Sequence, residues 1–317
     1  MLKEILKEKR PRLTDSSLNT YASVLRNVYK RAFDENVKEE DMDIKRFDEE
    51  EEKVLKSVET YAPSKRKSIL AALVVITGGN TKYRKPMLQD IAQYREEIGK
   101  QQKTEKQKEN WVTTEELQQM YEKWKAIATP LLKRKDALSS GELQRVQNFV
   151  MLALYTLLPP RRSADYFNFK IRNANETEDN FMKPTKVKKG QDAPTDASGE
   201  AIKTKQMFVF NKYKTAWKYH AQNSPVPEEL EKIMKAWIRV NPHDYLLIDT
   251  NGNQLDASKM HQRFNAIFGR KVSTTAFRHS FLTDKYKNTM EAMQEMDADL
   301  QRMGSSSAQA STYVKLD

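Results

Sequence analysis

The chain contains no cysteine among its 317 residues. Disulfide bonds, thiolate catalysis and cysteine-based zinc sites are therefore excluded. Histidine is scarce as well, and the four that occur show no metal-ligand spacing to one another or to carboxylates. We therefore expect no metal site and no cofactor.

Glycine and long apolar runs are also rare. The chain has 9 glycines and is rich in Leu, Glu, Lys and Ala, a composition that favours helix. Its longest apolar run, at 69–76, is far too short to span a bilayer. Residues 1–12 lack the uninterrupted apolar core of a signal peptide. We expect a soluble, intracellular protein without a membrane partner.

Charge is abundant but unevenly placed. Lysine and arginine (55) outnumber aspartate and glutamate (44), and the net charge of +11 favours an anionic partner, above all nucleic acid. A basic protein that is merely soluble is the alternative. Residues 34–52 carry eleven acids against three bases, which predicts a solvated face turned away from any nucleic acid. We expect the basic surface of this half of the chain at Lys65, Arg66, Lys67, Lys82, Arg84 and Lys85.

Residues 99–110 have no hydrophobic side chain and are typical of an exposed linker. They separate a first domain at 1–98 from a second at 111–317. The first domain is expected to be all helical, with one helix capped by Thr14 or Asp15 and another at 64–76.

The second domain shows helical and extended patterns together. Helices are predicted after a capping box at Thr113, after Ser139 or Ser140 and at 227–240. Two or three more are predicted between residue 253 and the end, one of them beginning near Ser273 to Thr275. Strands are predicted at 166–171 and 207–213, and a short one within 244–253, where it leads into an Asn-Gly turn; residues 183–206 are predicted to be mainly loop. The expected fold class is mostly α with a small antiparallel sheet (α+β).

Two basic positions in the second domain are suited to phosphate. Arg161 and Arg162 follow a double-proline helix stop, where a guanidinium can clamp a phosphate through two parallel hydrogen bonds. Asp165 is placed to orient Arg162. Lys212 and Lys214 lie at the end of a predicted strand, from which a lysine can reach a leaving oxygen and protonate it.

Two further positions complete a set that could act on a phosphodiester. Thr275, Arg278 and His279 share one face of a predicted helix, so Arg278 is a second candidate phosphate ligand. Tyr313 is a candidate nucleophile, although a phenol with a pKa near ~10 needs cations around the phosphate that it attacks.

In this order, these residues resemble the tyrosine recombinase family, which includes the phage integrases. That family has an Arg in an R-x-x-E/D context, a Lys on a β-hairpin, an H-x-x-R segment, and a G-H or G-W shortly before a nucleophilic Tyr. The resemblance covers 111–317 and agrees with a helical, DNA-clamping core-binding domain before the linker. It implies a catalytic domain of the tyrosine-recombinase type.

The resemblance assigns roles residue by residue. Arg162, with Asp165, and Arg278 match the two arginines, and Tyr313 matches the nucleophile. Lys214 matches the hairpin lysine, with Lys212 the second choice. The remaining basic residues, Arg161 and those at 65–67, are expected to contact DNA phosphates.

The chain departs from the family pattern at two positions. Thr275 stands where the family usually has the His of H-x-x-R, and Ser305 stands where it has His or Trp after the glycine. Both hydroxyls can donate a hydrogen bond, but neither is a base at neutral pH. His279 is the candidate substitute.

The implied activity is site-specific cutting and rejoining of DNA through a 3′-phosphotyrosyl intermediate, without metal or ATP. The implied partners are double-stranded DNA and three further copies of the chain, as a homotetramer on paired DNA sites. The protein would then come from a virus or mobile element and act wherever its DNA lies, in a host nucleus or in cytoplasm. The alternatives are a type IB topoisomerase or telomere-resolving enzyme, a catalytically weakened DNA-binding relative, and a helical scaffold that binds no DNA.

Overall fold

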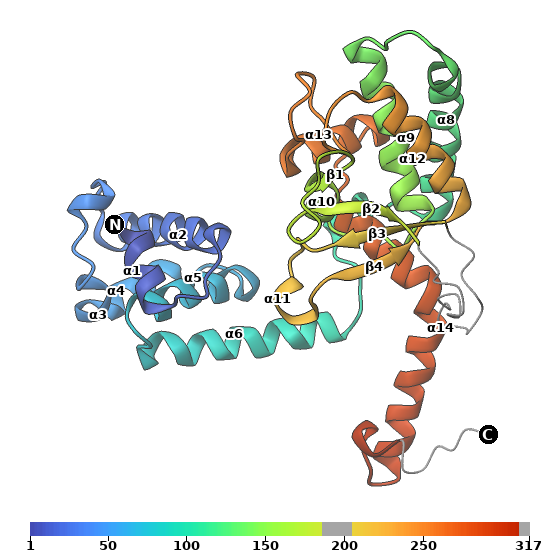
Figure 1. Ribbon diagram of the computed structural model, residues 1–317. Coiled ribbons are helices and arrows are strands. Elements are labelled where there is room, and N and C mark those ends of the chain that lie inside the picture. The colour runs from blue at the N-terminus through green and yellow to red at the C-terminus, as the bar shows by residue number, and fades with distance from the viewer. Residues whose placement is uncertain (186–204, 311–317) are drawn as a thin grey trace. The chain divides into compact units, whose positions relative to one another are not determined.

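The structure is a computed structural model that describes residues 1–185 and 205–310 (Figure 1). The chain divides into two compact units, with unit 1 ending at Lys103 and unit 2 beginning at Thr104. This boundary lies inside the segment expected as a linker. That segment is partly helical, because Thr104 forms a complete capping box at the start of a short helix.

Unit 1 contains helices and no strand. Thr14 accepts a hydrogen bond from the Ser17 amide (3.3 Å), so the predicted cap is confirmed. The predicted helix at 64–76 is α5, and six of its residues are buried from Ile69 onward, which makes it the central helix of this unit's core. The elements are α1 (Leu2–Lys9), α2 (Asp15–Phe33), η1 (Glu39–Asp41), α3 (Arg46–Glu49), α4 (Glu51–Val58), α5 (Pro63–Ile76) and α6 (Thr81–Gly99).

The acidic run at 34–52 is not simply a solvated face. The Asn80 amide donates to the carboxylates of Asp48 (2.8 Å) and Glu51 (3.3 Å), and Lys82 forms an ion pair with Glu51. Asp48 is exposed as expected, but the Glu51 side chain is only 16% exposed because the start of α6 packs against it. Lys82 is also taken up in this contact.

The predicted basic cluster of unit 1 is partly occupied by intramolecular contacts. The Arg66 guanidinium donates twice to Asp90, at 2.9 and 2.7 Å, and once to the Glu59 carbonyl, at 3.1 Å. Lys65 and Lys67 lie over the rings of Tyr61 and Tyr94. All three nitrogens of Arg66 thus have partners within unit 1.

Unit 2 combines helices with one sheet. Ser139, one of the two predicted caps, forms a reciprocal capping box with Glu142. The helices are α7 (Glu105–Glu109), α8 (Thr114–Lys133), α9 (Ser140–Thr156), α10 (Ser163–Phe167), α11 (Ala216–Tyr219), α12 (Glu228–Val240), α13 (Ala257–Phe268), α14 (Thr274–Arg302) and η2 (Ser307–Gln309).

The sheet has the order β1-β2-β3-β4, with β1 (Phe169–Lys170), β2 (Asn180–Pro184), β3 (Gln206–Phe210) and β4 (Gln222–Pro225). β1 pairs with β2 in parallel, and the other two pairs are antiparallel. The α+β class is confirmed, but the sheet is mixed rather than purely antiparallel.

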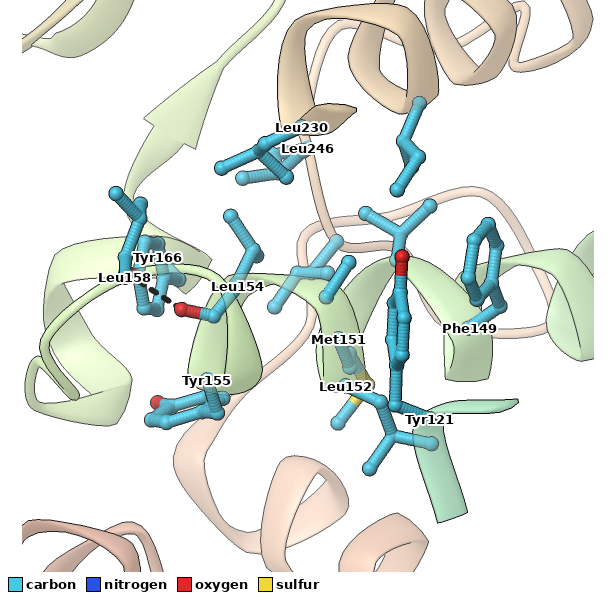
Figure 2. Close-up of a cluster of buried hydrophobic side chains, with 14 of the residues drawn as sticks. Tyr121, Phe149, Met151, Leu152, Leu154, Tyr155, Leu158, Tyr166, Leu230 and Leu246 are labelled. Carbon is cyan, nitrogen blue, oxygen red and sulfur yellow. Dashed lines mark hydrogen bonds between the residues drawn. The ribbon is translucent and has the colours of Figure 1, made fainter. Parts of the chain in front are cut away.

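Three strand predictions were too long. Tyr166 and Phe167 belong to α10, because the Tyr166 ring packs beneath α9 and its hydroxyl donates to the Leu154 carbonyl (3.4 Å; Figure 2). β3 ends at Phe210, and residues 244–253 form only isolated bridges. β2 and the polar β4 were not anticipated.

The core of unit 2 is built around α9. Ten of its 17 residues are buried, too many for an amphipathic surface helix, so other elements must cover it on several sides. Figure 2 shows Tyr121, Leu230 and Leu246 among the side chains that do so. This packing holds the end of α9 at Thr156 in place, a few residues before Arg161 and Arg162.

Removing the Arg66 side chain tests whether it is structural. Arg66→Ala leaves the Asp90 carboxylate, which is 1% exposed, without its cation, so the free energy of unfolding should fall by about 3–5 kcal/mol. Urea denaturation measures this loss. Lys85→Ala, at an exposed residue of α6, is the control and should change stability by less than about 0.5 kcal/mol.

The double variant Arg66→Met/Asp90→Leu should recover most of that stability, because it removes both charges together. If Arg66→Ala instead keeps full stability and weakens DNA binding, Arg66 is a phosphate ligand after all.

Candidate active site

Arg161, not Arg162, pairs with Asp165. The Arg161 guanidinium donates to Asp165 Oδ2 (2.9 Å) and to Gln222 Oε1 (3.1 Å). The predicted pairing is wrong because Arg162 is the residue before the first turn of α10, and the spacing of four residues brings Arg161 beside the carboxylate instead. The side chain of Arg162 makes no hydrogen bond or ion pair with the residues that the structure describes, and only its carbonyl accepts a bond, from the Asp165 amide (3.0 Å).

Arg162 and Arg278 are far apart in sequence but near enough in the fold for their charges to interact. The pKa of Arg278 is below its ordinary value, first because the side chain is partly buried and second because of the positive charge of Arg162. Asp165 is near both guanidinium groups, and both favour its ionised form. Two neighbouring cations repel each other, and an anion between them would relieve this repulsion.

Asp165 is a buried carboxyl, and one of its two oxygens accepts no hydrogen bond from the described residues. It is 3% exposed, and burial raises its pKa although Arg161, Arg162 and Arg278 act in the opposite direction. Its Oδ1 accepts no hydrogen bond from any described residue. Tyr155 is buried beside it, and burial raises the pKa of that phenol well above its ordinary value. The two arginines, Arg162 and Arg278, therefore lie near two buried polar groups, the Asp165 carboxyl and the Tyr155 hydroxyl.

The first turn of α14 contributes to the same region. Thr274 is buried near the Tyr155 hydroxyl, whereas Thr275 is exposed, and the side chain of Ser273 caps none of the first amides. The N-terminus of a long helix carries partial positive charge, which favours an anion. Arg278 lies in the second turn of this helix, so the two effects act on the same side of it.

His279 lies apart from Arg278. Its ring contacts Trp111, with centroids 6.3 Å apart and planes tilted by 34°. Arg278 is instead directed toward Arg162 and Asp165. The contact with Trp111 is that of a packed surface histidine.

Asn180, which sequence reasoning missed, links two parts of unit 2. One is the segment between β3 and β4, and the other is the turn that carries Arg161, Arg162 and Asp165, which we call the arginine corner. The Asn180 amide group donates to the carbonyls of Asp165 and Lys212, both at 2.9 Å, and its oxygen accepts from the Lys212 amide at 2.7 Å. The residue is fully buried. Its only sequence signal was a polar residue directly before the apolar pair Phe181-Met182.

The two candidate lysines have different surroundings. The pKa of Asp179 lies below its ordinary value: burial raises it, but the ion pair with Lys170 lowers it more. The charge of Lys212 also lowers this pKa, so Lys212 lies near that carboxylate. Lys214 is exposed and forms no ion pair within the described part of the chain. Of the two, Lys214 is the free cation.

Ser305 is not brought to the arginine pair. α14 runs without a break from Thr274 to Arg302, so its end lies about 36 Å from Arg278 along the helix axis. Gly304, with φ of +71°, and Ser305 then end the helix, since the Ser305 amide donates to the Leu300 carbonyl (2.7 Å). Figure 1 shows α14 leaving the body of unit 2. Tyr313 lies outside the described residues.

Comparisons with known proteins identify no relative: no family model, no curated protein and no solved structure matches the chain. Within residues 1–185 and 205–310, no three acidic or histidine side chains are grouped so that they could hold a metal ion. No described helix is both long and apolar enough to cross a membrane.

The pH dependence of stability tests whether burial raises the pKa of Asp165. Its raised pKa means that the folded state holds this proton to higher pH than the unfolded chain, so this group lowers stability as pH rises above ~3.9. The stability of Asp165→Asn minus that of the wild type should therefore increase with pH in the mildly acidic range. Urea denaturation at a series of pH values measures it.

Asp249→Asn is the matched control with the opposite sign. The hydrogen bond from Lys259 lowers the pKa of Asp249, so this carboxylate adds stability above ~3.9 that is lost as pH falls. The stability of Asp249→Asn minus that of the wild type should decrease as pH rises. Parallel curves for both variants would contradict the assignment.

Proposed function

We propose that the protein is a site-specific DNA strand transferase that acts as tyrosine recombinases do. The observation that carries this proposal is the meeting of Arg162 and Arg278 from distant parts of the sequence above a buried carboxyl. A pair of guanidinium groups at a helix N-terminus suits a phosphodiester, and the net charge of +11 suits the rest of a DNA duplex.

The reaction needs one bond made and one broken. The phenol of Tyr313 loses its proton to water, its oxygen attacks the scissile phosphorus, and the bond from phosphorus to the 5′ oxygen breaks, which leaves a 3′-phosphotyrosyl link. Arg162 and Arg278 stabilise the charge that develops on the non-bridging oxygens. A 5′ hydroxyl of another strand then attacks the link and releases Tyr313, so the phosphodiester energy is kept and ATP is not needed.

The leaving 5′ oxygen needs a proton, and Lys214 is the candidate donor. It is exposed and unpaired in the described residues, whereas Lys212 faces Asp179. The buried Asn180 holds the backbone of the segment in place, two residues before Lys214. Strand exchange in the family takes place in a homotetramer on paired sites, and this assembly on double-stranded DNA is part of the proposal.

A second candidate function is DNA binding without cleavage. It is favoured by the place of Ser305, which ends α14 far from Arg278, and by the exposed Thr275 in place of histidine. In that case the arginine pair would hold a phosphate without reaction. The first experiment below separates the two functions.

Covalent capture of DNA is the decisive measurement. The substrate is a pool of duplexes of random sequence with one 5′-bridging phosphorothiolate, whose sulfur leaves easily and returns poorly, so an adduct accumulates. We expect an adduct on Tyr313 for the wild type and none for Tyr313→Phe. The matched control, Tyr286→Phe, alters an exposed tyrosine of α14 and should keep full activity. Tight DNA binding without any adduct would leave only the second function.

The arginines are tested on the same pool. Arg162→Gln and Arg278→Gln should each reduce the rate of adduct formation by about 10²–10³-fold, as expected for a donor to a developing oxyanion. Arg145→Gln, at an exposed arginine of α9, should leave the rate unchanged. Equal loss in all three variants would mean that only bulk charge matters.

The proton donor is identified by sulfur rescue. Once a sequence that forms the adduct is selected from the pool, Lys214→Ala should lose about 10²–10⁴-fold on its ordinary phosphodiester but little on the 5′-sulfur substrate, because a thiolate needs no proton to leave. Lys212→Ala should keep most of its activity on both substrates. The reverse result would make Lys212 the donor.

A further inference from the structure

Trp217 is the most exposed large hydrophobic side chain among the described residues, at 79%. It lies on α11, the single helical turn in the connection between β3 and β4, and Tyr219 beside it is 54% exposed. Tryptophan usually buries most of its large ring. We call residues 213–220, which contain α11, the tip. An indole that is exposed to water at this tip suggests that a partner covers it.

The chemistry of the surrounding segment indicates which partner. Residues 205–226 contain four lysines and no aspartate or glutamate. Lys214 and Lys218, on either side of Trp217, are exposed and form no ion pair within the described residues. The Lys218 ammonium lies 5.0 Å from the centre of the Tyr219 ring, and neither ammonium is neutralised by a carboxylate of the described residues. An indole between two such cations suits a nucleobase between phosphates better than it suits an apolar or basic protein surface.

The tip is held in one shape. Tyr213 donates its hydroxyl hydrogen bond to the His220 carbonyl (2.7 Å), which closes the segment on itself. The amides of Lys218 and Tyr219 both donate to the Thr215 carbonyl, at 3.0 and 3.1 Å. A fixed aromatic platform loses little conformational freedom when a base stacks on it.

The tip is also joined to the arginine corner. The guanidinium of Arg161 lies 3.8 Å from the Phe210 ring centre and 5.5 Å from that of Tyr213. Arg161 is the residue before Arg162, and Asn180 binds the Lys212 backbone to Asp165. The segment that leads into the tip, at Phe210 and Tyr213, therefore lies beside Arg161, the neighbour of a proposed phosphate ligand.

From this arrangement we infer that Trp217 stacks on a nucleobase that is unstacked next to the bound phosphate, while Lys218 contacts a neighbouring phosphate of the same strand. This inference rests on the proposed function and adds a base-binding subsite to it. Stacking on an indole does not require a particular base. The subsite would hold the end of the cleaved strand in place until it is rejoined.

Equilibrium binding of the full chain tests the inference without any cleavage step. The two probes are a fully paired duplex and the same duplex with one unpaired 2-aminopurine, a base whose fluorescence falls when it is stacked. The wild type should bind the second probe roughly 5- to 150-fold more tightly and quench it. Trp217→Ala should lose both the preference and the quenching, and Trp217→Phe should keep part of each.

The affinity for the paired duplex and its dependence on salt should be unchanged in Trp217→Ala, because phosphate contacts remain. Tyr286→Ala is the matched control, since Tyr286 is an exposed aromatic residue between Lys285 and Lys287 on α14. It should keep the full preference. An equal loss in both variants would mean that any exposed aromatic residue suffices, and would overturn the inference.

Failure of the inference differs from failure of the proposed function. If the wild type binds both probes equally, or if Trp217→Ala keeps the preference, the subsite is wrong while DNA cleavage stands. If Trp217→Ala changes the sedimentation of the DNA-free protein, the tip is a contact between copies and the inference is overturned. If the wild type binds neither probe, the proposed function fails with it.

Discussion

The side chain of Arg161 is the contact on which the arrangement of the site depends. Its guanidinium bonds to Asp165 on α10 and Gln222 on β4, and lies over the ring of Phe210 on β3. One planar cation with several fixed donors can hold three elements at once, which a lysine cannot do. Arg161 bonds to Asp165 Oδ2, whereas the side chain of the next residue, Arg162, has no hydrogen-bond or ion-pair partner in the described residues and is near enough to Arg278 for the two charges to interact.

Keeping two guanidinium groups close together has an energetic cost in the absence of an anion. The lowered pKa of Arg278 and the raised pKa of Asp165 both reflect charges held partly away from water. Such strain is typical of sites that bind or transform a charged group, because the ligand relieves it. The buried packing of α9 and Asn180 holds these groups in place.

α14 sets the main constraint on how the site would be completed. Its 29 residues join Arg278 to the Gly304-Ser305 turn in one continuous helix. Arg278, Ser305 and Tyr313 follow one another along the chain in the order expected of a tyrosine recombinase. This order does not say how far apart the residues lie in space. The helix keeps Ser305 about 36 Å from Arg278 along its axis. Within the described residues, Ser305 therefore lies too far from Arg278 to contact the same phosphate.

Local pattern alone determined the α+β class, the caps at Thr14 and Ser139, and helix α5, because capping and apolar spacing act within a few residues. The assignment of Arg162 and Arg278 to one site came instead from the resemblance to tyrosine recombinases, and it stays a prediction. Which arginine binds Asp165, the role of Asn180, the occupied state of Arg66 and the mixed sheet were decided only by tertiary structure. Each depends on partners distant in the sequence or on where a short helix begins, and residue spacing along a chain does not specify either.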